Sequence, residues 1–194
     1  MTYAVRNATP APDATAEDFK GAMRGLAGGV SVITVGQGRD ITGMTVTSVT
    51  SLSVEPPTLI VSVNRSSSSW PLLRRYGAFG VNILGADQRE IAERFTGKGG
   101  LKGADRFAGA DWVIGTSGTT LLVGALAAID CEVEEIIERH SHAIVIGRVR
   151  QVLNETARPA LVYWDGGYAA HQHAQEGVTV PVTSSSLARG LREI

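Results

Sequence analysis

The 194-residue sequence lacks several features that would place it in a common class of proteins. Its single cysteine, Cys131, excludes a disulfide framework and a cysteine-based metal cage, and it fits a reducing compartment. No stretch reaches the roughly eighteen apolar residues of a membrane-spanning helix, and the first residues show no basic start followed by an apolar segment. We therefore expect a cytoplasmic protein.

An excess of charge of one sign is also absent. The chain has 18 lysines and arginines against 19 aspartates and glutamates, with lysine only at Lys20, Lys98 and Lys102. Because the cations are spread along the chain, nucleic-acid binding through a basic face is not expected. At this length a single domain is the default. Residues 1–14 and 172–194 are aperiodic, which predicts an N-terminal tail and a C-terminal tail or dimer arm around a domain at 15–171.

Runs of β-branched residues predict a chain made mainly of strands. The first three runs are separated by breaks too short for a crossover helix, which favours antiparallel pairing. Many strands with few helices predict a β-barrel or sandwich. The predicted strands cover 30–35, 44–54, 58–64, 79–84, 126–139, 143–153 and 160–168.

Alternation along one late strand predicts a core face and a solvent face. Ile129, Cys131 and Val133 would point inward. Three acidic residues would face water: Asp130, Glu132 and Glu134.

Short helices interrupt the strands. Thr15 and Asp18 can cap a helix, and the apolar spacing of the residues that follow places one face together. That face consists of Phe19, Met23 and Leu26. A second helix is predicted to follow Ser69, and a third to begin with a capping box between Asp87 and Glu90.

The segment between Met44 and Val54 is rich in hydroxyl groups, and its apolar spacing slips near Ser48. A slip predicts a bulge or a strand that ends in a loop. Hydroxyls and unpaired backbone N–H groups there would suit a phosphate or a heterocycle with carbonyl groups, although a solvated strand face has the same composition. The sequence NRSSSSWP brings an arginine and serines to a helix start, which suits an anion, and a serine cap beside a surface Arg65 is the alternative.

In the order in which they occur, these motifs resemble the short-chain flavin reductases, over residues 17–170. The resemblance rests on GLAGGVSVITV, GMTVTSVTSLSVEPPTLIVSVNRSSSSWP, FGVNIL followed by IAERF, HAIVIGRV and PALVYWDGGY. It implies an antiparallel, Greek-key type, FMN-binding split β-barrel. The double proline Pro56-Pro57 is expected to be structural, ending one strand and directing the next.

The resemblance also implies which residues bind the cofactor. The ring edge and ribityl chain would be held by Thr45, Val46, Thr47, Ser48, Thr50 and Ser51. The phosphate side would be faced by Arg65, Ser66 and Ser67 with Arg94 and Arg106, and further contacts are expected from Asn64, Trp70 and Phe95.

On the nicotinamide side, the family often carries Gly-Asp-His, where this chain has Arg139-His140-Ser141-His142. His142 keeps the histidine position and is the candidate catalytic residue, and Tyr168 is expected to line the same side. A histidine at a strand start is also a common satisfied polar residue, and His140 with His142 has the spacing of a metal pair. We expect no metal, because only distant residues would complete such a site.

The implied function is an NADH- or NADPH-dependent flavin reductase. Such an enzyme would pass a hydride to the N5 atom of FMN or FAD and supply the reduced flavin to a separate monooxygenase. A homodimer is implied as well. Two alternatives stay open: a flavin-binding electron carrier without nicotinamide turnover, and a β-barrel that binds a ligand other than flavin.

Overall fold

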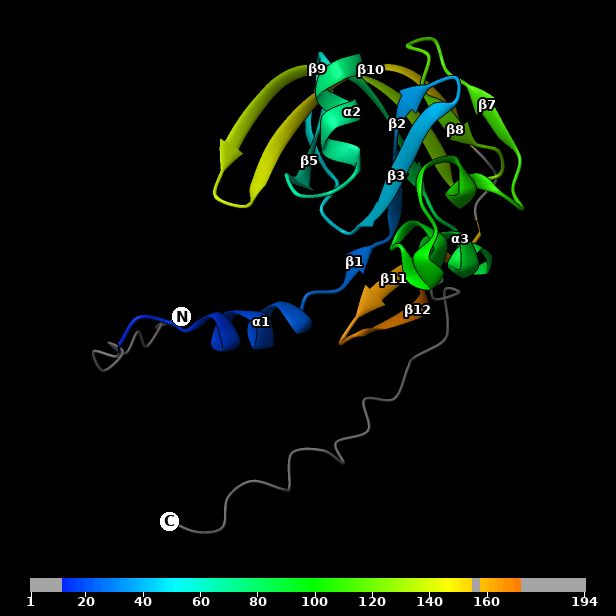
Figure 1. The fold of residues 1–194 in the computed structure, drawn as a ribbon. Helices are drawn as coiled ribbons and strands as arrows, with labels where there is room; N and C mark the ends of the chain where they lie inside the picture. The colour runs from blue at the N-terminus through cyan, green and yellow to red at the C-terminus, as the bar shows by residue number, and fades with distance from the viewer. Residues whose placement is uncertain (1–11, 155–157, 172–194) are drawn as a thin grey trace, which may run out of the picture.

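One antiparallel sheet forms the frame of the molecule. The computed structural model describes residues 12–154 and 158–171; of the tails predicted at 1–14 and 172–194, all but residues 12–14 lie outside these ranges. Seven strands follow the order β3-β2-β6-β9-β10-β5-β4, and all neighbours are antiparallel (Figure 1). This confirms the predicted antiparallel, mainly β fold. The strands are β2 (Ser31–Gln37), β3 (Asp40–Val46), β4 (Thr50–Val54), β5 (Pro57–Asn64), β6 (Ala78–Ile83), β9 (Ala127–Arg139) and β10 (His142–Asn154).

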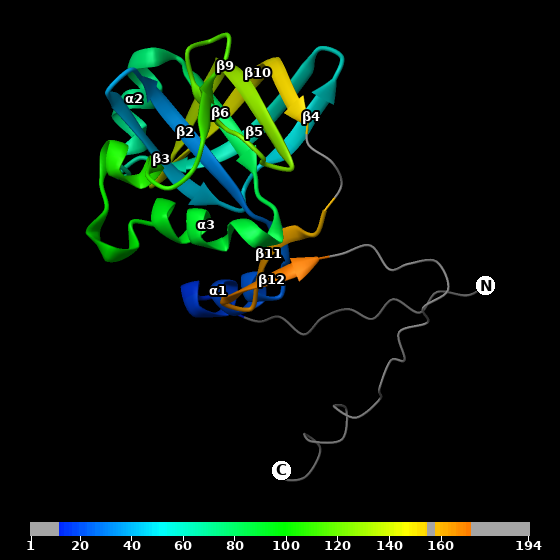
Figure 2. The same ribbon diagram turned by 90° about the vertical axis from the view of Figure 1, so that its right-hand side faces the viewer.

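Two smaller sheets extend this frame. One pairs β7 (Trp112–Ile114) with β8 (Thr120–Leu122), and the other has the order β1-β11-β12. The predicted strand at 160–168 is in fact a hairpin, because Asp165 and Gly166 have φ values of 47° and 83° and reverse the chain. Figure 2 shows this hairpin below the main sheet, beside α1 and α3. Its sheet consists of β1 (Gly28–Gly29), β11 (Ala160–Trp164) and β12 (Gly167–His171).

The second and third α-helices pack against this frame. Within the described ranges, every helix is too short or too polar to cross a membrane. The α-helices are α1 (Ala16–Arg24), α2 (Ser69–Tyr76) and α3 (Arg89–Phe95), and the 3-10 helices are Ala86–Gln88, Lys98–Gly100 and Gly103–Phe107.

The predicted cap of α1 is confirmed, and the other two helix starts need correction. Asp18 N–H donates to Thr15 Oγ1 (3.1 Å) and Thr15 N–H donates to Asp18 Oδ2 (3.0 Å). The Thr15 hydroxyl, which donates to Asp18 Oδ2 at 2.6 Å, and then the Thr15 N–H lower the pKa of Asp18. Helix α2 starts one residue early, with Ser69 inside it and Ser68 at the cap position without a side-chain bond.

The predicted Asp87–Glu90 capping box is wrong. Gln88 Oε1 accepts from Gly85 N–H at 2.9 Å instead. The reason is long-range: Asp87 pairs with Arg158, whose Nη1 lies 2.9 Å from Asp87 Oδ2.

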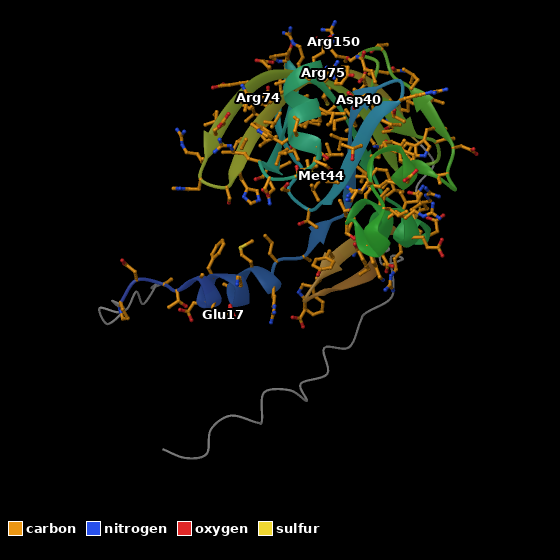
Figure 3. The ribbon with its side chains drawn as sticks, in the orientation of Figure 1. Glu17, Asp40, Met44, Arg74, Arg75 and Arg150 are labelled. Atoms are coloured by element: carbon orange, nitrogen blue, oxygen red, sulfur yellow. The ribbon has the colours of Figure 1, made fainter. Side chains whose placement is uncertain are left out.

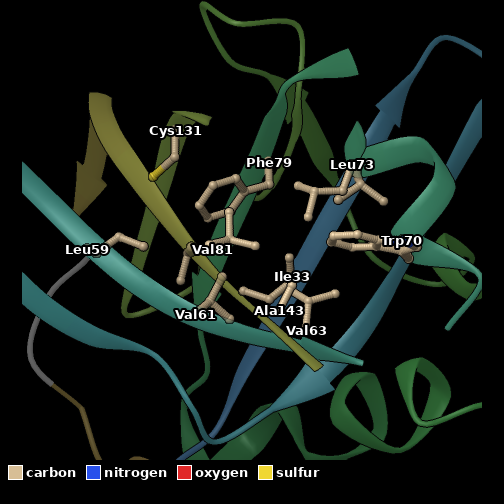
Figure 4. Close-up of a cluster of buried hydrophobic side chains, with 12 residues drawn as sticks. Ile33, Leu59, Val61, Val63, Trp70, Leu73, Phe79, Val81, Cys131 and Ala143 are labelled. Atoms are coloured by element: carbon tan, nitrogen blue, oxygen red, sulfur yellow. The ribbon is translucent and has the colours of Figure 1, made fainter. Parts of the chain in front are cut away.

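Two apolar clusters fill the molecule. The first lies inside the curved sheet, where Trp70 and Leu73 of α2 pack against Ile33, Val61 and Phe79 (Figure 4). The second lies below it, where α3 packs against the 3-10 helix Gly103–Phe107 and the β11–β12 hairpin. These clusters leave β3, α3 and β12 around a common space.

The predicted solvent face of β9 is only partly correct. Glu132 and Glu134 are exposed, but Asp130 is completely buried. The turn between β7 and β8 folds over this carboxylate and supplies donors from Thr116, Ser117 and Thr119. A buried carboxylate with matched donors is a stable arrangement that alternation alone does not reveal.

Candidate active site

A cavity of about 450 Å³ opens between the end of β3, helix α3 and the β11–β12 hairpin. Its volume is in the range of small-molecule sites. Four residues predicted to bind a cofactor line it: Thr45, Val46, Thr47 and Tyr168. The sequence prediction missed eight others: Val30, Arg89, Glu93, Thr96, Lys98, Tyr163, Gly166 and Gly167.

Two cations and one carboxylate share a wall of this cavity. Glu93 Oε1 lies 2.9 Å from Arg89 Nε, and Glu93 Oε2 lies 2.9 Å from Lys98 Nζ. Hydrogen bonds from Lys98 and then Arg89 lower the pKa of Glu93. The group therefore carries one net positive charge. The i, i+4 spacing of Arg89 and Glu93 on a helix and the rarity of lysine in this chain were the signals available in the sequence.

Tyr168 contributes an aromatic face to the same cavity. The Arg89 guanidinium lies 5.5 Å from the centre of the Tyr168 ring, and the Tyr163 ring packs against it at 5.3 Å between centroids. Burial raises the pKa of Tyr168, and the negative charge of Glu93 adds to this effect. Its hydroxyl therefore stays protonated at neutral pH.

The hydroxyl-rich segment is a strand that ends in a loop. This confirms one of the two predictions made from the irregular spacing of its apolar residues near Ser48. Strand β3 ends at Val46, residues 47–49 form the loop, and β4 begins at Thr50. β4 ends at Val54 and β5 begins at Pro57, so the double proline does sit at the junction of two strands.

Several hydroxyls of the hydroxyl-rich segment are already hydrogen-bonded within the protein. Thr45 Oγ1 donates to Ala92 O at 2.5 Å. Ser48 Oγ donates to Ser62 O (3.1 Å) and accepts from Ser62 N–H (3.2 Å), so this side chain continues the sheet edge. Thr50 and Ser51 lie exposed on the edge strand β4. Within the described part of the chain, no hydrogen bond is found for the backbone N–H groups of residues 47–49.

The NRSSSSWP segment lies at the start of α2 and does not line the cavity. Asn64 Oδ1 accepts from Ser66 N–H (2.9 Å) and Ser66 Oγ (2.8 Å). Arg65 contacts the turn between β9 and β10. Ser67 Oγ is buried without a partner among the described residues. Trp70 is 9% exposed and belongs to the core, so a cofactor contact of its ring is not supported.

Arg94, Phe95 and Arg106 serve the scaffold beneath α3. Arg94 Nη1 donates to Ala108 O, and Arg106 Nη1 donates to Gly43 O at 2.5 Å. The Phe95 ring is buried, with its centroid 5.0 Å from that of Phe107. Arg94 also lines a second cavity together with Glu93 and Lys98. Arg106 and Phe95 are engaged within the protein, so the geometry gives no support to the phosphate contact predicted for Arg106 or to the cofactor contact predicted for Phe95.

His142 is the first residue of β10 and is exposed. It pairs with Arg139 across the turn and with Asn64 on β5, and its Nδ1 lies 2.9 Å from Ser141 Oγ. Among the residues that the structure describes, no group of three or more histidine, cysteine or acidic side chains is placed to hold a metal ion.

Known proteins resemble this chain in both sequence and fold. The model of the flavin reductase like domain matches residues 23–172. FMN reductase (NADH) RutF of Stutzerimonas stutzeri (strain A1501) is 38% identical over 152 residues, which cover 78% of this chain and 86% of the relative.

Two solved structures show the same fold. BorF, the flavin reductase component of a bacterial two-component tryptophan halogenase, superposes with a TM-score of 0.75 at 30% identity, covering 82% of this chain and all of BorF. The NADH:FAD oxidoreductase SgcE6 of Streptomyces globisporus C-1027 has a TM-score of 0.75 at 29% identity, covering 85% of this chain and all of SgcE6.

The chain belongs to the flavin reductase family, and its fold is the split β-barrel of that family. It is an NAD(P)H-dependent flavin reductase, as the sequence resemblance implied. The alternatives of an electron carrier without nicotinamide and of a barrel for another ligand are therefore set aside.

Proposed function

We propose that the cavity between β3, α3 and the β11–β12 hairpin holds the flavin. The observation that carries this proposal is that one cavity is lined both by two cations, Arg89 and Lys98, and by the residues at the end of β3. Thr47 follows β3 in this lining, and among the described residues no hydrogen bond is found for its backbone N–H. A flavin nucleotide needs donors at its polar ring edge, an apolar or aromatic face and cations at its phosphate. The cavity offers all three, with Tyr168 as the aromatic face.

In this arrangement the phosphate contacts Arg89 and Lys98 rather than Arg94 and Arg106. Arg94 and Arg106 donate to backbone carbonyls, whereas among the described residues the side chains of Arg89 and Lys98 are found paired with Glu93, and Arg89 also lies over the Tyr168 ring. Glu93 would keep both cations in place before the anion arrives. A phosphate would add charge-assisted hydrogen bonds to cations that are already positioned.

Riboflavin, which lacks the phosphate, tests this assignment. We expect Lys98→Ala to raise the FMN KM about tenfold, the loss of one charge-assisted hydrogen bond, and to leave the riboflavin KM unchanged. Lys102→Ala, an exposed lysine outside the cavity, is the matched control. If Ser67→Ala raises the FMN KM selectively and Lys98→Ala does not, the phosphate lies at the serine run instead.

Hydride transfer from the reduced nicotinamide to flavin N5 is chemistry that the two bound groups supply. The protein's part is to orient them and to stabilise charge on the flavin ring. We propose that the backbone N–H groups of residues 47–49 donate to the ring edge where negative charge develops. We further propose that His142 and Tyr168 line the nicotinamide side. His142→Ala should then raise the nicotinamide KM more than it lowers kcat, and an unchanged KM would remove His142 from the site.

We propose NADH and FMN as the preferred pair, because RutF relatives are named FMN reductase (NADH). SgcE6, named as an NADH:FAD oxidoreductase, makes FAD the second candidate flavin. The test is to compare kcat/KM for all four pairings of NADH or NADPH with FMN or FAD. A higher kcat/KM with FAD or with NADPH would reverse the corresponding choice.

We propose that the reduced flavin leaves for a separate oxygenase component. The cavity opens to solvent, and BorF is named as the reductase component of a two-component halogenase. Placing the reductase and a flavin-dependent oxygenase on opposite sides of a dialysis membrane tests free diffusion of the flavin. Product formation across the membrane is expected, and product formed only on mixing would show that transfer needs direct contact.

We also propose a homodimer in which α1 contacts the second copy. None of the α1 residues is buried, and Figure 3 shows the helix extending away from the barrel. Phe19, Met23 and Leu26 are 63%, 44% and 63% exposed, and Trp164 of the neighbouring hairpin is 55% exposed. A nine-residue helix is marginal in water without packing, so this apolar face needs a partner.

Light scattering after gel filtration tests the dimer. We expect twice the chain mass for the wild type and the chain mass for the double variant Phe19→Ser, Leu26→Ser. Val113→Ser, at an exposed position on β7, is the control and should stay dimeric. A monomeric wild type would contradict the proposal.

A further inference from the structure

Arg65 is joined to the turn between β9 and β10 by three separate contacts. Its backbone N–H donates to Ser141 O at 2.9 Å, and its Nη1 donates to His140 O at 3.0 Å. Its Nη2 lies 2.6 Å from Glu138 Oε2. The planar fork of the guanidinium therefore serves a carbonyl of the turn and a carboxylate at the end of β9, the strand that leads into the turn. An arginine held in this way is directed at the protein and not at a ligand.

The turn that Arg65 contacts is tight and strained. Arg139 and His142 are paired, so only His140 and Ser141 connect the two strands. His140 has a φ of 50°, a backbone region that glycine adopts freely and that costs other residues about 1 kcal/mol or more. Donors at the carbonyls of both turn residues offset this cost. They also hold the turn in one conformation.

This turn determines where His142 lies. His142 directly follows Ser141, whose Oγ lies 2.9 Å from its Nδ1. On the other side His142 pairs with Asn64, the residue before Arg65. Any movement of Arg65 against the turn would therefore shift the histidine that we place on the nicotinamide side.

We propose that Arg65 is a positioning residue, which holds the β9–β10 turn so that His142 faces the nicotinamide. This inference rests on the proposed role of His142 and replaces the phosphate contact expected for Arg65 from the sequence. Lysine keeps the charge, but its single ammonium does not reproduce the planar fork that serves Glu138 and His140 O together.

The test is a double-mutant cycle on the intact enzyme. We expect Arg65→Lys to lower kcat/KM for NADH about tenfold at saturating FMN, mainly through KM, with the FMN KM unchanged. In a His142→Ala background the same substitution should cause no further loss, because the two residues act through one contact chain. Glu138→Gln should shift the NADH KM in the same direction. Arg74→Lys is the matched control, because Arg74 Nη1 lies 3.9 Å from Glu138 Oε1 and the side chain is exposed.

Four results would overturn the proposal. A rise in the FMN KM without a rise in the riboflavin KM would make Arg65 a phosphate ligand. Additive losses in the cycle would show that Arg65 acts independently of His142, and an unchanged NADH KM would remove it from the nicotinamide side. If His142→Ala itself leaves the NADH KM unchanged, the role of His142 fails first and this inference fails with it. Melting temperatures of all variants identify any loss that comes from unfolding.

Discussion

The buried carboxylate of Asp130 should be a main determinant of stability. Its Oδ2 accepts from Thr116 Oγ1 (2.9 Å) and Ser117 N–H (2.6 Å), and its Oδ1 accepts from Thr119 Oγ1 (2.5 Å). The side chain is completely buried. Asp130→Ala would leave three donors without this acceptor, and each unpaired buried donor costs about 1–3 kcal/mol. Allowing for rotation of the two hydroxyls to other partners, we expect a loss of roughly 3–5 kcal/mol.

Asp130→Asn should cost much less. The amide oxygen still accepts from Ser117 N–H, and the amide nitrogen can donate to the hydroxyl that it faces. We expect a loss of about 1–2 kcal/mol, mainly the charge assistance. At about 2–4 °C per kcal/mol for a chain of this size, the alanine variant should melt about 10 °C below the wild type and the asparagine variant about 4 °C below it.

The measurement is thermal unfolding by circular dichroism at one fixed protein concentration, because an oligomer's melting temperature depends on concentration. Glu132→Gln on the same strand is the control. Its carboxylate is half exposed, 3.6 Å from Arg150 Nε, and should contribute less than about 1 kcal/mol. The hydrogen-bond argument is incorrect if Asp130→Ala and Glu132→Gln have the same melting temperature, or if Asp130→Asn lowers the melting temperature as much as Asp130→Ala does.

Two further predictions concern the core. In Gly147→Ala the added Cβ would lie 2.4 Å from Phe79 Cζ, so overpacking should lower the free energy of unfolding by about 1–3 kcal/mol. The measurement is the midpoint of urea unfolding, which should fall; an unchanged midpoint would mean that the ring moves away freely. Burial, with a smaller contribution from Asp130, raises the pKa of Cys131 to about 12, so the thiol should resist alkylation at pH 8 until the protein unfolds. Because the folded pKa is the higher one, this thiol's contribution to stability is complete below about pH 9 and is lost as the pH rises toward 12. Rapid labelling at pH 8 would contradict this.

Local patterns in the sequence predicted the frame but not the contacts between distant segments. Most strands of the main sheet and the Thr15 cap followed from alternation and spacing within a few residues, whereas the breaks inside the predicted strands 44–54 and 160–168 did not. Asp130 was assigned to water because alternation identifies a face and does not show that another turn covers it. The Asp87 cap failed for the same reason, since Arg158 lies 71 residues away and competes for the carboxylate.

The hydroxyl-rich segment shows the same limit within the site. The sequence located the segment correctly beside the cavity, but it treated every polar group there as available to a ligand. Thr45 and Ser48 instead join the strand end to α3 and to β5, and Arg65 holds a turn. Among the residues that the structure describes, these bonds leave the backbone N–H groups of the loop that follows Val46 without a partner. The proposed recognition of the flavin by the main chain would explain why composition indicated a ligand without identifying the donors. It also implies that alanine substitutions of the hydroxyls will disturb the loop's position more than they remove direct contacts to the flavin.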